Sequence, residues 1–189
     1  MNLFPIFLKL EGRRCVVIGA GAVGTQKIAG LLEAGADVVV VDPSPAVSFR
    51  EHFASRVTWQ KRNYVPPDLD AAYLVIVATS DEALNWQIYD EAQRRGILAN
   101  VVDVPPLCDF YYPAVVRRGA LIVAVSSQGE SPHLAQRVRD EISEALPEEL
   151  SSAVDRIGEE RRRILREHQA GPERLQLLRD LVYPRGARA

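Results

Sequence analysis

The chain has 189 residues, of which 47% are apolar and 25% are charged, proportions that are ordinary for a soluble globular protein. The net charge of −2 argues against a nucleic-acid partner, which usually requires a basic surface. The two cysteines, Cys15 and Cys108, form neither a metal-ligand spacing nor a disulfide framework. No apolar run approaches the roughly 20 residues that cross a bilayer, and charged residues interrupt the first apolar stretch too early for a signal peptide. We therefore expect a cytoplasmic protein with no membrane partner and no metal site.

Short apolar strands alternate with helices in the first part of the chain. Strands are predicted over residues 15–18, 38–41, 57–60, 73–78 and 97–102, and helices over residues 25–34, 47–54 and a segment that starts after Ser80 or Asp81. Such alternation is typical of a parallel sheet with crossover helices. Residues 1–113 are thus predicted to form an α/β domain with a Rossmann-type parallel sheet.

The pattern changes after this domain. Two apolar strands, 114–116 and 121–125, flank a turn predicted at Arg117-Arg118-Gly119, and a helix runs from Ser131-Pro132 to Pro147. This unit of residues 114–147 has more apolar surface than so small an α+β segment could bury on itself, so we expect a homodimer through it. Residues 148–189 are rich in Arg, Glu and Leu and are predicted to be a helical C-terminal domain.

The turn Gly19-Ala20-Gly21-Ala22-Val23-Gly24 matches the dinucleotide fingerprint G-x-G-x-x-G. The motif follows a predicted strand and opens a helix, which is the context that makes it specific. Gly19 permits the tight turn, Gly21 lets a pyrophosphate approach the backbone, and Gly24 lets the helix pack closely on the sheet. The N–H groups of this turn, including those of Ala22 and Val23, would then face the phosphates. The alternative is a glycine turn that binds nothing.

An acidic residue, Asp42, ends the next strand, 18 residues beyond Gly24. Its carboxylate can accept hydrogen bonds from the adenosine ribose and would repel a 2′-phosphate, so the expected cofactor is NAD, with Pro43 beside it. Thr79 and Ser80 follow another strand, where open α/β sheets bind ligands, and they suit the ribose–nicotinamide half. Asp81 could also act as a plain helix cap there.

Several ordered motifs resemble the precorrin-2 dehydrogenase family, whose module also forms the N-terminal part of sirohaem synthase. The matching segments are Leu3-Phe4-Pro5-Ile6-Phe7-Leu8-Lys9-Leu10, the GAGAVG turn with Lys27, Ala78-Thr79-Ser80-Asp81 with Asn85, Asn100-Val101-Val102-Asp103, Cys108-Asp109-Phe110 through Pro113-Ala114, and Ser126-Ser127-Gln128-Gly129-Glu130-Ser131-Pro132. Together they extend over roughly residues 1–145. Three features depart from the family: Gly24 replaces a frequent alanine, Gln128 replaces a small residue, and the tail after Pro147 matches weakly.

The resemblance implies a function and an architecture. The reaction would be the oxidation of precorrin-2 to sirohydrochlorin with NAD⁺ as hydride acceptor, on the path to sirohaem or cobalamin. The fold would be a Rossmann domain, a small dimerisation domain and a helical C-terminal domain, with the active cleft formed in a homodimer. Some members also insert Fe²⁺ into sirohydrochlorin. Methylation is not expected, because the sequence has no methyltransferase domain.

Oxidation of precorrin-2 needs a base, and the resemblance places the family's functional aspartate at Asp103. This residue follows a strand on the ligand side of the sheet, where a carboxylate can act as general base; it could instead cap a turn. The candidate substrate-binding residues are Asn100, Phe110, Ser126, Ser127 and Gly129. The polar loop at Ser126 suits a substrate carboxylate, but it could be an ordinary connection, and Phe110 could simply pack.

Three functional hypotheses are compatible with these features of the sequence. The chain could be the dehydrogenase alone, a bifunctional enzyme that also inserts Fe²⁺, or a non-enzymatic NAD-sensing domain. His133, near the proposed substrate loop, could assist metal delivery or be a plain surface residue, and Cys108 could be reactive or simply packed.

Overall fold

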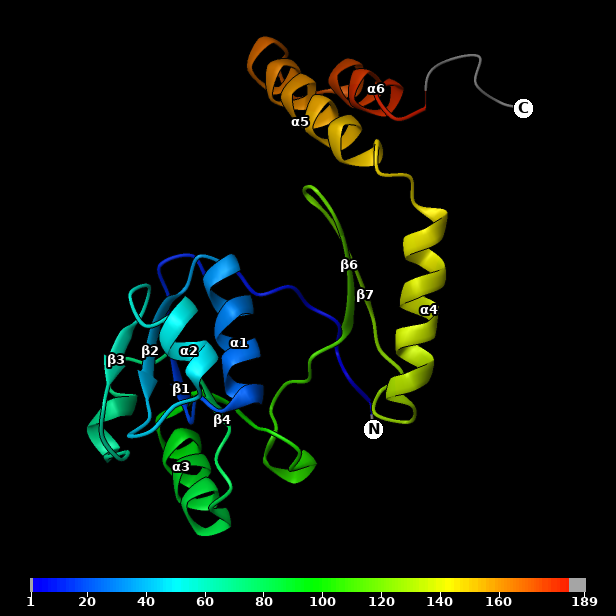
Figure 1. Ribbon diagram of the computed structural model, residues 1–189. Coiled ribbons are helices and arrows are strands. Elements are labelled where there is room, and N and C mark those ends of the chain that lie inside the picture. Colours follow the sequence, from blue (N-terminus) through cyan, green and yellow to red (C-terminus); the bar gives the residue numbers. More distant parts are fainter. Residues whose placement is uncertain (1, 184–189) are drawn as a thin grey trace. The chain divides into compact units, whose positions relative to one another are not determined.

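The computed structural model describes residues 2–183, which divide into two compact units (Figure 1). The sheet unit is Pro5–Tyr111, and the hairpin unit comprises the described residues of Met1–Phe4 and Tyr112–Ala189. Residues 184–189 of the predicted helical C-terminal domain lie outside the described residues. A separate boundary near residue 147 stays a prediction.

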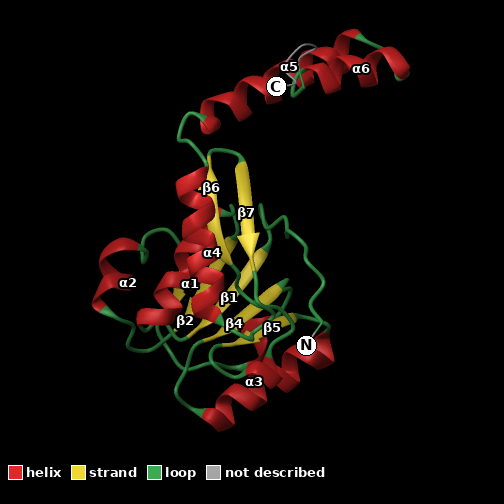
Figure 2. Cartoon of the chain, turned by 90° about the vertical axis from the view of Figure 1, so that its right-hand side faces the viewer, coloured by secondary structure: helices red, strands yellow, loops and turns green. Residues whose placement is uncertain are grey.

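Five parallel strands form the sheet of the first unit, in the order β3-β2-β1-β4-β5 (Figure 2). They are β1 (Arg14–Ile18), β2 (Asp37–Val41), β3 (Thr58–Gln60), β4 (Leu74–Val77) and β5 (Leu98–Val101). The predicted α/β class with a Rossmann-type sheet is confirmed. Every predicted strand of this unit is present. Four of them are runs of mainly β-branched or other apolar residues that a two-sided sheet can bury, whereas β3 at the edge of the sheet is partly exposed.

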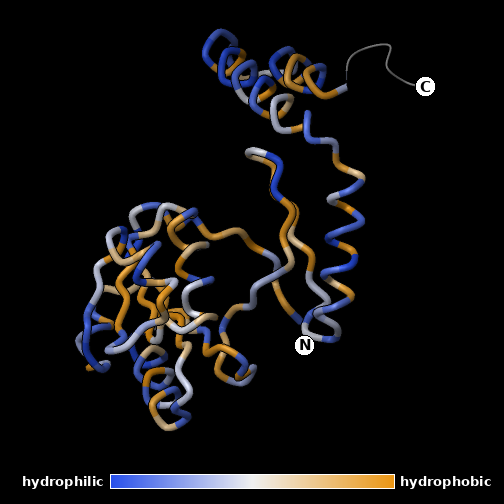
Figure 3. The backbone as a smooth tube through the Cα atoms, in the orientation of Figure 1, coloured by the Kyte–Doolittle hydropathy of each residue, from blue (hydrophilic) through white to orange (hydrophobic). Residues whose placement is uncertain are grey.

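Helices cover both faces of this sheet (Figure 1). One face packs against α1 (Ala22–Glu33) and α2 (Val47–His52), through Ile28 and Phe49. The other packs against α3 (Glu82–Arg95) and the short 3-10 helix η1 (Pro66–Leu69), through Ile88 and Leu69. Successive strand residues alternate between the two cores, and Figure 3 shows the apolar residues concentrated in the strands.

The strand order reverses direction between β1 and β4. From β1 the chain builds outward through β2 to β3, and it then returns to place β4 on the other side of β1. In open α/β sheets the ligand binds at such a switch point, outside the carboxyl ends of the strands. The glycine turn follows β1 and therefore lies at this position.

The hairpin unit contains β6 (Ala114–Arg118) and β7 (Leu121–Val125), with α4 (Pro132–Ala145) packed alongside (Figure 2). The turn predicted at residues 117–119 is wrong, because Arg118 pairs with Leu121 and only Gly119 and Ala120 remain in the turn. The Arg118 guanidinium donates to the carbonyl oxygens of Ser143 (2.7 Å) and Leu146 (3.3 Å), which holds the strand to the end of α4.

Two further helices, α5 (Leu150–Glu167) and α6 (Pro172–Asp180), pack on each other. Their presence agrees with the helices expected after residue 148. Within residues 2–183, no helix is both long and apolar enough to span a membrane.

Candidate functional site

Two glycines of the turn after β1 are required by close approaches of the backbone. Gly19 has a φ of +89°, and a Cβ there would overlap the carbonyl oxygen of Ala78 at the end of β4. A Cβ on Gly24 would overlap the carbonyl oxygen of Gly19. At Gly21, in contrast, nothing lies within 4 Å of an added Cβ. The backbone at Gly21 is therefore open to a ligand, while the turn around it is tightly packed.

Helix α1 begins inside this turn. The sequence pattern predicted a start at Thr25, but the helix starts at Ala22 with Gly21 as its N-cap. The reason is that the Thr25 N–H already donates to the Gly21 carbonyl (2.9 Å), and its hydroxyl donates to the same oxygen (2.7 Å). First-turn N–H groups have no acceptor within a helix, and no acidic side chain lies in this turn. The end of α1 thus suits an anion such as a phosphate.

Asp42 follows β2 and is held in place by the backbone. One carboxylate oxygen accepts from the N–H of Ala20 and the other from the N–H of Ser44, each at 2.6 Å. The indole of Trp59 donates to the Asp42 carbonyl (3.0 Å). Because each carboxylate oxygen has a second acceptor site, Asp42 is still able to accept hydrogen bonds from a ligand.

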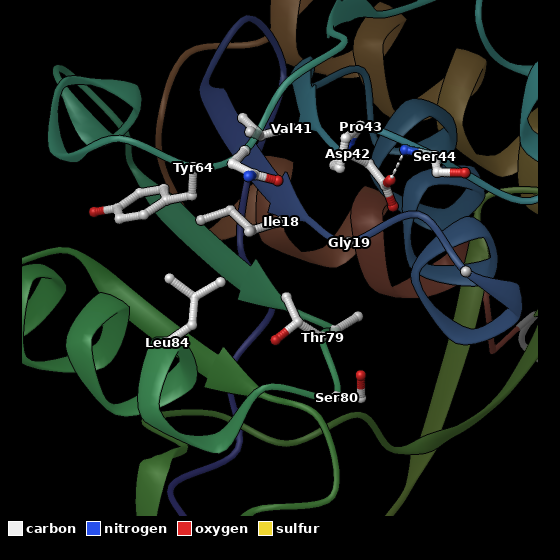
Figure 4. Close-up of a pocket in the computed structure, with 13 residues that line it drawn as sticks. Ile18, Gly19, Val41, Asp42, Pro43, Ser44, Tyr64, Thr79, Ser80 and Leu84 are labelled. Carbon is white, nitrogen blue, oxygen red and sulfur yellow. Dashed lines mark hydrogen bonds between the residues drawn. The ribbon is translucent and has the colours of Figure 1, made fainter.

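A pocket of about 340 Å³ joins these elements, a volume within the usual range for small-molecule sites. Its lining residues are Ile18, Gly19, Gly21, Val41, Asp42, Pro43, Ser44, Asn63, Tyr64, Ala78, Thr79, Ser80 and Leu84. Figure 4 shows Asp42 with Ser44 at one end and the Tyr64 ring with Ile18 and Leu84 toward the other. The pocket thus offers hydrogen-bond acceptors at one end and an apolar slot at the other.

Six of the sequence-predicted cofactor residues line this pocket, namely Gly19, Gly21, Asp42, Pro43, Thr79 and Ser80. Ala22, Val23 and Gly24 belong to the adjoining first turn of α1. The sequence reasoning missed Asn63 and Tyr64, which lie on the loop after β3. The sequence did contain a signal for them, because both residues follow a predicted strand of the parallel sheet. The carboxyl ends of parallel strands lie at the same edge of the sheet, where ligands bind.

A buried asparagine fixes the loop after β4. The Thr79 hydroxyl donates to Oδ1 of Asn85 (2.6 Å), and Nδ2 of Asn85 donates to the Thr79 carbonyl (3.2 Å). Asp81 accepts from the Leu84 N–H (3.0 Å) and caps α3. This helix-cap interpretation is compatible with a ligand role for Thr79 and Ser80, since both residues line the pocket.

Asp103 lies in a turn two residues beyond β5, is exposed, and has a φ of +60°. This left-handed conformation is uncommon for a residue with a side chain. Half-buried Lys27 on α1 interacts electrostatically with it. Burial lowers the pKa of Lys27, and the negative charge of Asp103 opposes that shift. The turn after β5 and helix α1 therefore place a carboxylate and an ammonium group near enough to interact electrostatically.

The residues around Asp103 make structural contacts. Asn100 is buried, and its amide donates to the Phe110 carbonyl (2.7 Å). The Phe110 ring packs against the core shared by β1 and α1. These contacts agree with the packing alternative for Phe110, and the substrate roles of both residues stay predictions. Burial raises the pKa of the Cys108 thiol, so the reactive alternative for this cysteine is disfavoured.

The polar loop before α4 is held by its own hydroxyl groups. Ser126 Oγ accepts from the Gln128 N–H (3.1 Å), and Ser127 Oγ accepts from the Ser131 N–H (3.0 Å). Gln128 and Gly129 have φ values of +55° and +87°. Both serine hydroxyls can still donate a proton to a ligand, and the substrate role of the loop stays a prediction.

His133 is exposed at the start of α4. No group of three or more potential metal ligands occurs among the described residues.

Comparisons with known proteins cover both units. Residues 6–114 match the family described as "Putative NAD(P)-binding", and residues 118–145 match "Sirohaem biosynthesis protein central". The sirohaem synthase of Nitrosococcus oceani is 39% identical over 84% of this chain and 33% of its own length. Siroheme synthase 1 of Cronobacter sakazakii is 43% identical over 84% of this chain and 34% of its own length.

A solved structure named "SirC, precorrin-2 dehydrogenase" superposes with a TM-score of 0.80 at 26% identity, covering 95% of this chain and 89% of that one. The present chain spans about a third of the length of the curated sirohaem synthases that it matches. The chain therefore belongs to the putative NAD(P)-binding family, whose model matches more than half of it, as the glycine motif had indicated.

Proposed function

We propose that this chain is an NAD⁺-dependent precorrin-2 dehydrogenase, which oxidises precorrin-2 to sirohydrochlorin. The observation that carries the proposal is the pocket at the β1–β4 switch point, where the glycine turn and Asp42 meet. The family membership and the likeness to SirC support the same reaction.

The residues of the pocket fit a dinucleotide. The open backbone at Gly21 and the start of α1 would hold the pyrophosphate, and Asp42 would accept the ribose hydroxyls. NAD⁺, when bound, supplies the hydride acceptor. We favour NAD⁺ over NADP⁺ because the Asp42 carboxylate would repel a 2′-phosphate, and the guanidinium of Arg62 is engaged by Asp68 (2.6 and 2.8 Å).

We assign Asp103 as the general base that removes a proton from the macrocycle. Its position beyond β5 supports this role, because a turn next to a strand holds a side chain more rigidly than a long loop does. Lys27 would attract a carboxylate of the tetrapyrrole to the same place. We further propose that Ser126, Ser127 and Gly129 bind a substrate carboxylate, and that the enzyme acts as a homodimer. A cytoplasmic location stays a prediction from the sequence.

An anaerobic assay with precorrin-2 tests the proposal. Purified chain, precorrin-2 and NAD⁺ should yield the visible spectrum of sirohydrochlorin together with NADH, and NADP⁺ should support a slower reaction. Later addition of Fe²⁺ tests the chelatase alternative through the spectrum of sirohaem. Tight NAD⁺ binding without any sirohydrochlorin would contradict the proposal and favour the NAD-sensing alternative.

Substitution of Asp103 tests the assignment of the base. Asp103→Asn keeps the shape of the side chain and removes its basicity, so kcat should fall by about 10²- to 10⁴-fold. NAD⁺ affinity and the melting temperature should stay near those of the unmodified protein, because the side chain is exposed. Near-normal turnover by this variant would show that Asp103 is not the base.

A further inference from the structure

The turn that carries Asp103 is closed by a single backbone hydrogen bond. The Val104 N–H donates to the Val101 carbonyl (3.2 Å), and Asp103 sits between these residues with its φ of +60°. This conformation is uncommon for a residue with a side chain, although aspartate adopts it more readily than most. Backbone hydrogen bonds from outside the turn help to hold it: the Val102 N–H donates to the Val77 carbonyl and the Leu107 N–H donates to the Val104 carbonyl, each at 2.9 Å.

Side chains of the following segment fasten this loop to the sheet. The Asp109 carboxylate accepts from the Ala99 N–H and from Nε2 of Gln93, each at 2.8 Å. The Asn100 amide donates to the Phe110 carbonyl (2.7 Å). Both interactions anchor the returning chain against β5, but neither reaches the turn that holds Asp103.

Cys108 does reach this turn. Its Sγ lies 3.2 Å from the carbonyl oxygen of Val101 and 3.4 Å from that of Val104, the residues at the two ends of the turn. The thiol is present as a donor at neutral pH, because burial raises its pKa and the charges of Asp109 and Asp103 add to the rise. It can donate its proton to either carbonyl.

We propose that Cys108 is a positioning residue for the reaction: its thiol, which can donate to the carbonyl on either side of Asp103, holds this carboxylate in the orientation in which it removes the substrate proton. The inference rests on the proposed role of Asp103. Misplacement of a catalytic group by even 1 Å can be costly in rate, so a weak hydrogen bond at this turn can affect turnover more than stability.

Replacements at Cys108 separate donation from packing. Cys108→Ser keeps a donor and should retain kcat within about threefold, whereas Cys108→Ala removes it and should lower kcat about tenfold with little change in KM or in NAD⁺ affinity. Amide hydrogen exchange at Val104 should accelerate in the alanine variant and not in the serine variant. If that variant is too unstable, Cys108→Val, which fills the site without a donor, gives the same comparison. Tyr111→Phe, which removes a hydrogen bond to the nearby Pro105 carbonyl (3.0 Å), is the matched control and should match the wild type.

A double-mutant cycle with Asp103→Asn tests whether Cys108 acts through the aspartate. The tenfold effect of Cys108→Ala should disappear in the Asp103→Asn background, because no base remains to be positioned. An equal tenfold loss in both backgrounds, or wild-type kcat in the alanine and valine variants, would overturn the inference and leave the proposed function intact. Full activity of Asp103→Asn itself would overturn the proposed base, and the inference with it.

Discussion

Asp42 determines the cofactor preference that we expect, because both of its carboxylate oxygens are oriented by backbone N–H groups. Asp42→Ala should weaken NAD⁺ binding about ten- to a hundredfold, since hydrogen bonds to a charged group are lost. Asp42→Ser with an arginine at the neighbouring position 43 should shift preference toward NADP⁺. Calorimetric titration with both cofactors measures the effect, and a melting curve controls for folding. NADP⁺ binding by the wild type that equals its NAD⁺ binding would contradict this view of Asp42.

Gly24 and Gly30 lie on the same helix and provide a matched pair of substitutions. A Cβ at Gly24 meets the backbone of Gly19, whereas at Gly30 nothing lies within 4 Å. Gly24→Ala should cost about 1–3 kcal/mol of unfolding free energy through overpacking, and it should weaken NAD⁺ binding because the turn must shift. Gly30→Ala should stabilise the protein by up to about 1 kcal/mol, since alanine is the better helix former.

Urea unfolding of the two glycine variants gives both free energies. If the two substitutions changed the unfolding free energy equally, the close contact between Gly24 and the Gly19 backbone would not limit the side chain at position 24. Members of the family that this chain resembles often have alanine at the position of Gly24. The Gly24→Ala variant therefore also tests whether the turn of this chain differs from theirs.

At the scale of elements, one loop depends on an ion pair between the buried carboxylate of Asp68 and the exposed side chain of Arg62. Asp68 is 6% exposed and accepts from the Arg62 guanidinium and from the Val65 N–H (2.9 Å). Burial alone would raise the pKa of Asp68, but these hydrogen bonds keep it below its ordinary value. The pair closes the loop that carries Asn63 and Tyr64 into the pocket.

The sign of this shift predicts a pH dependence. Because the folded pKa lies below the unfolded value near 3.8, the stabilisation is present above that value and is lost as the pH falls through the folded pKa. Asp68→Asn should lower the unfolding free energy by about 2 kcal/mol at pH 7, and the difference between the wild type and the variant should narrow as the pH falls below 3.8. Asp70→Asn, which removes an exposed partner of Arg95, is the control and should cost under about 1 kcal/mol. A difference that stays constant with pH would contradict the assignment.

Local patterns predicted the strands and the glycine turn, because burial on both faces and a tight turn leave clear traces in the sequence. The hairpin turn was misplaced, since Arg117 and Arg118 are polar strand residues whose partners lie across the sheet. The place of Tyr64 in the pocket and the contacts of the Cys108 thiol with the carbonyls of Val101 and Val104 were also not predicted. Their positions depend on contacts between distant segments, such as that of Arg62 with Asp68, which no local pattern contains.

At the scale of the whole molecule, the two family matches follow the two units. The nucleotide-binding match covers the sheet unit, and the sirohaem central match lies within the hairpin unit. The proposed chemistry is divided in the same way, with NAD⁺ and Asp103 assigned to the first unit and the carboxylate-binding serines to the second. Activity should therefore require both units. If the hairpin unit also forms the dimer, activity should depend on dimerisation as well.

Within residues 2–183, one face of the hairpin in the hairpin unit is only partly covered, because Val115 and Ile122 on it are half-buried. Two-stranded sheets are marginally stable alone, and here α4 covers the side on which Val116 is buried. By the alternation of the strands, Val115 and Ile122 point to the opposite side. Among the described residues, each of these strands is paired along one edge only, and the other edge can pair with another chain. A second copy of this chain could bury these features, which is why we expect a homodimer.

Sedimentation equilibrium at micromolar concentration should give twice the chain mass. Ile122→Asp should shift the protein to monomer and lower dehydrogenase activity, because a buried charge without a partner opposes association. Leu175→Asp on α6, where leucine is 67% exposed, should leave the dimer intact. A monomeric wild type would refute the dimer, and dissociation by Leu175→Asp alone would place the interface on the C-terminal helices instead of on the hairpin.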